Sequence, residues 1–167
     1  MIAAVIAARS LRNSSKALGL AESESQEKRL GIEPYLIEAR KVILANGDAF
    51  AAFAVSYTNR ASLPNSLVKM ELWVKYVGPP GEARQVLIQA DESFPPDVAK
   101  IKCLALPANI PARSSTTGWF VFKLPEYLSG RSAENYKVVG YTAQGPEVSL
   151  MSYLLMDTIF YGKDPNE

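Results

Sequence analysis

The chain has 167 residues, a net charge of +1, one cysteine and no histidine. This length suits one domain, and the balanced charge argues against the strong positive field of a nucleic-acid-binding surface. Without histidine and with one thiol, a catalytic triad, a zinc site or haem ligation is hard to build. We therefore expect no transition metal, no cofactor, no nucleic-acid partner and no enzymatic activity.

The first thirty residues differ in composition from the rest of the chain. Residues 1–8 (MIAAVIAA) are apolar and uncharged, and the residues after them are rich in Ala, Leu, Glu, Lys and Arg, with no proline before Pro34. Such residues favour a helix, so the sequence predicts one long helix over Ile2–Leu30, with Gly31 as its stop. Its expected attachment residues are the apolar Ile2, Val5 and Ile6 and the basic Arg9, Arg12 and Lys16.

Two interpretations of this helix stay open. In one, its apolar side docks on the domain or on a partner helix, including the helix of a second copy. In the other, residues 1–8 are the end of a membrane helix, and the basic residues form a juxtamembrane cluster on the cytoplasmic side. Eight apolar residues alone are too few, because a spanning helix needs about 20. The lone cysteine fits a reducing compartment, so we expect the protein in the cytoplasm or at the cytoplasmic face of a membrane.

From Ile32 onward the sequence follows the two-residue period of β-strands. Residues 41–44 precede Asn46-Gly47-Asp48, which predicts a hairpin because Asn and Gly tolerate positive φ. The return strand is expected over Ala49–Thr58.

The segment Leu67–Val77 has the clearest strand pattern. Alternation predicts an inward face of Val68, Met70, Leu72, Val74 and Tyr76 and an outward face of Lys69, Glu71, Trp73 and Lys75. An outward tryptophan can mark a partner site, although the N-terminal helix or a loop could also cover it. The outward face is therefore the candidate partner-binding surface.

Later segments complete the β pattern. Residues 117–124 are apolar on both faces, which favours a central strand, and Trp119 within them is expected in the core. Cys103 is expected to be a small buried residue beside Ile101 and Ala105. Further strands are expected over 83–90, 98–106, 136–142 and 148–156, and one helical turn over 125–130.

Two strings of the sequence resemble a known kind of protein. Residues 55–67 (VSYTNRASLPNSL) and 110–122 (IPARSSTTGWFVF) resemble elements of small, largely uncharacterised bacterial immunoglobulin-like β-sandwich proteins. Arg9-Ser10-Leu11-Arg12 with Lys16-Ala17-Leu18 resembles the basic helix after their membrane anchor. The resemblance implies the sandwich fold and an attachment helix, but it brings no catalytic residue to this chain. The chain differs from an anchored member in lacking a full-length spanning segment.

The sequence as a whole predicts a mainly β protein. We expect an antiparallel immunoglobulin-like β-sandwich of eight or nine strands at the usual spacing of about 8–12 residues, preceded by one long helix. Expected units are the helix (1–31), the sandwich (32–160) and a polar tail (161–167). The expected function is a non-enzymatic binding or accessory module, tethered through its helix to a membrane or a larger assembly. The alternative is a small-molecule or lipid carrier with a pocket between the sheets.

Overall fold

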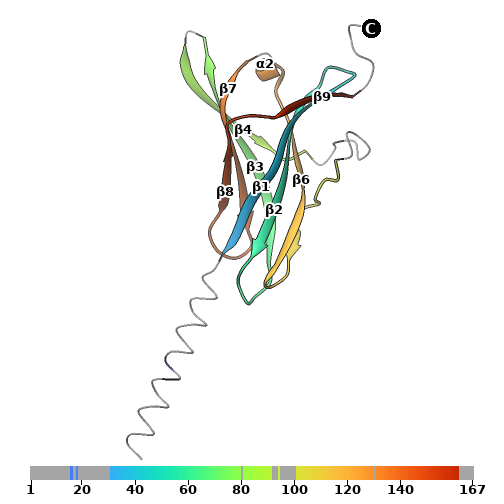
Figure 1. The fold of residues 1–167 in the computed structure, drawn as a ribbon. Coiled ribbons are helices and arrows are strands. Elements are labelled where there is room, and N and C mark those ends of the chain that lie inside the picture. The colour runs from blue at the N-terminus through green and yellow to red at the C-terminus, as the bar shows by residue number, and fades with distance from the viewer. Residues whose placement is uncertain are drawn as a thin grey trace, which may run out of the picture.

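The computed structural model describes residues 16, 18, 31–79, 81–91, 94, 101–129 and 131–161, without the side chains of Ser129 and of residues 157–161. Two β-sheets pack face to face (Figure 1). The four-stranded sheet has the spatial order β6 (Ser114–Lys123), β2 (Ala49–Asn59), β1 (Ile32–Leu44) and β9 (Asp157–Tyr161). The five-stranded sheet has the order β4 (Glu82–Gln89), β3 (Asn65–Gly78), β7 (Ala133–Thr142) and β8 (Val148–Ser152), with β5 (Ala108–Ile110) also paired to β3.

The mainly β prediction is confirmed, and most pairs are antiparallel. The exception is the pair β1–β9, which is parallel. The single helical turn, α2 (Glu126–Ser129), lies in the predicted place between β6 and β7. The predicted hairpin is also confirmed, because Gly47 has a φ of 84° and its N–H donates to the Leu44 carbonyl at 2.9 Å.

The faces of β3 agree with the prediction except at the start of the strand. Met70, Leu72, Val74 and Tyr76 are buried in the core as predicted, but Val68 is 47% exposed and Leu67 is fully buried instead. A register shift in the β3–β7 pairing, between Leu67 and Lys69, is the cause. Such a bulge inserts one residue and exchanges the two faces of the strand on either side of it.

Two strand predictions were wrong: one in the place of the strand within its sheet, and one in that the segment is not a regular strand. Residues 117–123 lie in β6, which ends at Lys123 and is a terminal strand of its sheet, not a central one. The expected strand over 98–106 is, from Ile101 onward, an irregular segment with one isolated bridge between Cys103 and Trp119. This segment lies along the outer edge of β6, where the Leu104 N–H donates to the Trp119 carbonyl at 2.9 Å. The second half of β6 is apolar on its outer face as well, because Val121 packs there with Phe94 and Ile101.

Two core predictions and one strand prediction need correction. Cys103 is exposed, because the half-buried residues of its segment are Leu104 and Leu106. Trp119 is only half-buried, and Arg40 lies over its ring at 5.5 Å. The expected strand over 148–156 ends at Ser152 as β8, and a separate strand, β9, begins at Asp157 in the other sheet (Figure 1).

Two apolar clusters hold the sheets in place. The larger fills the space between the sheets and includes Phe53, Phe122 and Leu72. The smaller lies on the outer face of the four-stranded sheet, where Phe94 and Ile101 pack against Phe50. Because β2 contributes to both clusters, its apolar residues are buried on both faces. This fits the position of β2 inside its sheet, between β6 and β1.

Several predictions concern residues outside the described set. The predicted helix over Ile2–Leu30 and its attachment residues lie outside it, apart from Lys16 and Leu18, which are helical and exposed. The predicted polar tail also lies outside it, except for its first residue, Tyr161, which belongs to β9. In the part of the chain that the structure describes, no helix combines the length and the apolar character that crossing a membrane requires.

Candidate binding surface

The outer face of the five-stranded sheet carries the four residues that the sequence singled out. Lys69, Glu71, Trp73 and Lys75 alternate along β3 with the buried core residues, so all four lie on the side away from the other sheet. Their environments differ, however. Lys69 and Lys75 are exposed and Trp73 is half-buried, whereas Glu71 is buried. Glu71 thus lies on the predicted outward face but is not solvent-exposed.

Glu71 is the centre of a polar cluster that joins β3 to β7. Its Oε1 accepts from the Lys69 ammonium at 2.6 Å, and its Oε2 accepts from the Tyr141 hydroxyl at 2.8 Å. The Trp73 indole N–H donates to the same Oε2 at 3.3 Å. Lys69 also lies 5.4 Å from the centre of the Tyr141 ring. A carboxylate bound by three donors holds each of them in one orientation.

This cluster changes the acidity of its members. The Lys69 ammonium, followed by the Tyr141 and Trp73 donors, lowers the pKa of Glu71 even though burial opposes the shift. The pKa of Tyr141 is raised, chiefly because its hydroxyl donates to Glu71. Since the folded pKa of Glu71 is lowered, its contribution to stability is present above its ordinary pKa and is lost as the pH falls through the lowered value.

A row of side chains that is apolar except for Lys137 crosses this face around Trp73. Leu87 of β4 lies opposite Trp73 on one side, and Lys137 of β7 lies opposite it on the other. The next residue in the row is Met151 of β8. Leu87 and Met151 are both exposed, so the half-buried indole lies in a row with aliphatic side chains on two other strands. Tyr141, Leu87 and Met151 were not predicted from the sequence, because strand pairing between distant segments decides their positions.

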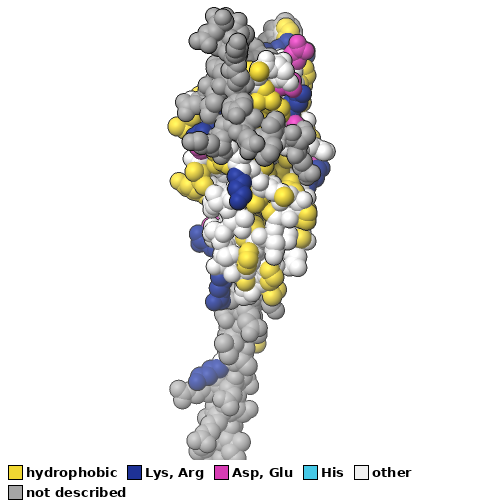
Figure 2. All heavy atoms as spheres, turned by 90° about the vertical axis from the view of Figure 1, so that its right-hand side faces the viewer, with side chains coloured by type: hydrophobic (Ala, Val, Ile, Leu, Met, Phe, Trp, Pro, Cys, Tyr) yellow, Lys and Arg dark blue, Asp and Glu magenta, His cyan; other side chains and the backbone are white. Residues whose placement is uncertain are grey.

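The charges beside this row are largely paired. Lys75 forms an ion pair of 2.8 Å with Glu134, and Lys69 is bound to Glu71. On the side of the molecule seen in Figure 2, Lys and Arg side chains lie singly among polar and apolar ones and form no continuous basic patch. The two ion pairs on the outer face of the five-stranded sheet fit a surface that recognises shape and apolar area more than net charge.

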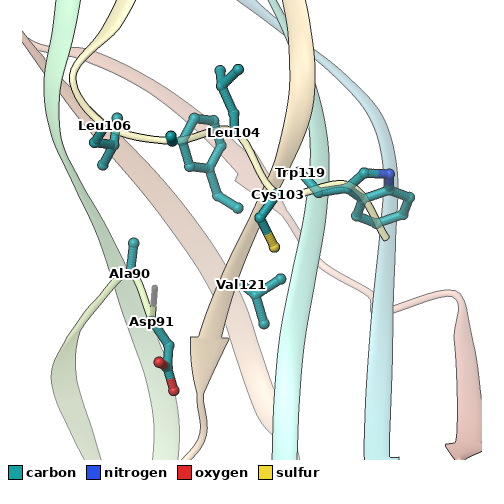
Figure 3. A pocket seen from close by; sticks show the side chains of 9 residues that line it. Ala90, Asp91, Cys103, Leu104, Leu106, Trp119 and Val121 are labelled. Carbon is teal, nitrogen blue, oxygen red and sulfur yellow. The ribbon is translucent and has the colours of Figure 1, made fainter. Parts of the chain in front are cut away.

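A small cavity lies at the side of the sandwich, where residues 90–91 and 103–106 lie between β4 and β6 (Figure 3). Its volume is about 270 Å³, slightly below the roughly 300–1,000 Å³ of typical ligand pockets. Cys103 and Leu104 line it, and Trp119 is turned away toward β1. Partial desolvation of the thiol in this cavity, and then the charge of Asp91, raise the pKa of the Cys103 thiol, so this thiol is a poor nucleophile.

Two further observations concern metal ligands and one carboxylate in the described residues. Within them, no group of three or more Cys, Asp or Glu side chains could hold a metal ion. An open hollow of about 700 Å³ lies at one end of the sandwich beside the Lys123–Asp48 ion pair. There, the Lys123 ammonium lowers the pKa of Asp48, which keeps that carboxylate ionised and unsuited to general acid catalysis.

Comparisons with known proteins bear on the fold alone. No family model matches the chain, and no curated protein matches it significantly. The structure is similar to that of a protein described as a putative lipoprotein from Staphylococcus aureus, with a TM-score of 0.50, 9% sequence identity, and coverage of 80% of this chain and 91% of that one. The sporulation control protein Spo0M of Bacillus subtilis aligns less well, with a TM-score of 0.39, 10% identity, and coverage of 80% and 49%. The resemblance to small bacterial β proteins thus has support at the level of a β-rich fold.

Proposed function

We propose that this protein is a non-enzymatic binding module that docks a protein partner on the outer face of its five-stranded sheet. The single observation that carries the proposal is the position of Trp73. Its indole lies in the row from Leu87 to Met151 and is oriented by the buried Glu71. Contact sites between proteins are enriched in tryptophan and depleted in unpaired charge at their centre.

The rigidity of this face supports the proposal. Glu71 binds Lys69, Tyr141 and Trp73 at once, so the donors lose little further freedom when a partner binds. Side chains fixed in advance reduce the entropic cost of association. Within this proposal the fold is an immunoglobulin-like sandwich, supported by the two packed sheets.

The first experiment tests the docking face. We would place a photo-crosslinking amino acid at Trp73 in the full chain, expressed in its own host, and identify the crosslinked proteins by mass spectrometry. We expect a discrete partner that is captured from this position. The matched control carries the same crosslinker at Thr117, which is exposed on the outer face of the other sheet. Capture of no protein, or of the same proteins from both positions, would contradict the proposal.

We also propose that the N-terminal segment attaches this module to a membrane or a larger assembly, at the cytoplasmic face. The support is the sequence itself, since Ile2, Val5 and Ile6 precede the basic Arg9, Arg12 and Lys16. Basic residues next to an anionic leaflet each add about 1 kcal/mol, which reinforces attachment but cannot supply it alone. An apolar partner or lipid contact at the first residues must contribute the rest.

Removal of residues 1–30 tests the attachment. We expect the truncated protein to keep a cooperative thermal transition, because the described strands and the residues of both apolar clusters all lie at or after Ile32. Liposome flotation and size-exclusion chromatography should report lipid binding or assembly for the full chain, and less of it for the truncation. Equal lipid binding and equal assembly of the two proteins would contradict an attachment role for residues 1–30.

A further inference from the structure

The terminal strands of the two sheets differ in how they are protected against pairing with another strand. Exposed strand edges attract further strands, and proteins block them with short strands, proline, bulges, charges or covering segments. The first half of β1, which is not paired to β9, carries Pro34 and a bulge beside Leu36. β8 and β9 have only five residues each, and residues 102–104 cover the edge of β6.

β4 has little protection of this kind along most of its length. It has eight residues, pairs with β3 in one uninterrupted register, and pairs with no other strand of the described chain. Its charges, Glu82 and Arg84, lie at one end beside the turn, and the remaining run Gln85-Val86-Leu87-Ile88-Gln89 is uncharged and contains no proline. The β3–β4 hairpin, green in Figure 1, projects at one corner of the sandwich.

The sequence of β4 is complementary to itself in one antiparallel register. If Leu87 lies on a two-fold axis opposite its own copy, Gln85 lies opposite Gln89 and Val86 lies opposite Ile88. Amides then face amides and aliphatic side chains face aliphatic side chains. Cross-strand pairs of this kind stabilise sheets, whereas like charges directly opposite each other destabilise them. In this register Arg84 lies opposite the uncharged Ala90.

We infer that a second copy of this chain pairs with β4 edge to edge, in the antiparallel register centred on Leu87. The two five-stranded sheets then form one continuous sheet across a two-fold axis. Because Leu87 lies opposite Trp73 on the outer face, the apolar rows of the two copies join into one. The dimer therefore presents two Trp73 faces side by side, which goes beyond the docking face of a single chain.

Cysteine crosslinking tests the register directly. In the full chain carrying Cys103→Ser, Leu87→Cys should be joined to its own copy by a short bifunctional maleimide, because residues opposite each other in adjacent strands have Cβ atoms about 4.5–5.5 Å apart. The matched control is Val77→Cys, since Val77 is 46% exposed and Leu87 is 45% exposed, but Val77 lies on β3, one strand inward. Equal crosslinking of the two variants, or none at position 87, would overturn the inference.

A second measurement guards against misfolding of the variants. Leu87→Lys places two ammonium groups opposite each other across the axis, so sedimentation equilibrium should give a dimer dissociation constant at least about tenfold above that of Val77→Lys. Both variants should keep the thermal transition of the parent protein. If Leu87→Lys associates as tightly as Val77→Lys, the edge of β4 is not the contact. Trp73→Ala should leave Leu87→Cys crosslinking in place, which separates this inference from the proposed docking function.

Discussion

Leu67→Ala is expected to lower the free energy of unfolding by about 2–5 kcal/mol, because it removes a fully buried side chain and leaves a cavity. The neighbouring change Val68→Ala should cost no more than about 0.5 kcal/mol, because Val68 is half-exposed. Urea unfolding of both variants in the full chain would measure the difference. Simple alternation along β3, which places Val68 inward, predicts the reverse order.

This pair of variants is therefore a direct test of the bulge between Leu67 and Lys69. Comparable shifts of the urea midpoint for the two variants, or a larger shift for Val68→Ala, would mean that the strand has no bulge at this point. Leu72→Ala provides the reference, since Leu72 is buried at a position where alternation and structure agree. The slope of the free energy against urea should stay constant, which would confirm that only stability has changed.

The same bulge illustrates where sequence reasoning succeeds and where it stops. The period of two predicted β3 correctly from Met70 to Tyr76, because the register shift between Lys75 and Tyr76 skips Glu134 of β7 and inserts no residue into β3. The one inserted residue exchanges the inward and outward faces of β3 before Lys69. No residue type near Val68 indicates that insertion in the sequence. The break between β8 and β9 was missed for a similar reason, because Tyr153-Leu154-Leu155-Met156 contains neither glycine nor proline.

The candidate surface was predictable only along one strand. Alternation placed Lys69, Glu71, Trp73 and Lys75 together, which the structure also shows. It gave no means of knowing that Tyr141 binds Glu71, since the two residues are 70 positions apart. Pairing between strands is decided by the whole sheet, so the burial of Glu71 and the apolar row with Leu87 emerged only from the fold.

Asn59→Asp is the second change with a large expected effect. Asn59 is 1% exposed, and its amide nitrogen donates to the carbonyls of Leu63 at 2.9 Å and Ile110 at 3.1 Å. Its amide oxygen accepts from the Ala61 N–H at 3.0 Å. One side chain thus closes the loop after β2 and ties it to β5. Aspartate has nearly the same shape but offers no such pair of donors.

The substitution should lower the free energy of unfolding by about 1–3 kcal/mol or more, because the buried Ile110 carbonyl loses its donor and the partly buried Leu63 carbonyl loses a second one. Burial beside carbonyl oxygens raises the pKa of the new carboxyl in the folded state. Its stability deficit should therefore grow as the pH rises past about 4, the ordinary pKa of aspartate. Thermal unfolding over a pH series would measure this, with Asn109→Asp as the control because Asn109 is exposed in β5. A deficit that matches the control, or that does not change with pH, would show that Asn59 does not hold this loop through its buried amide.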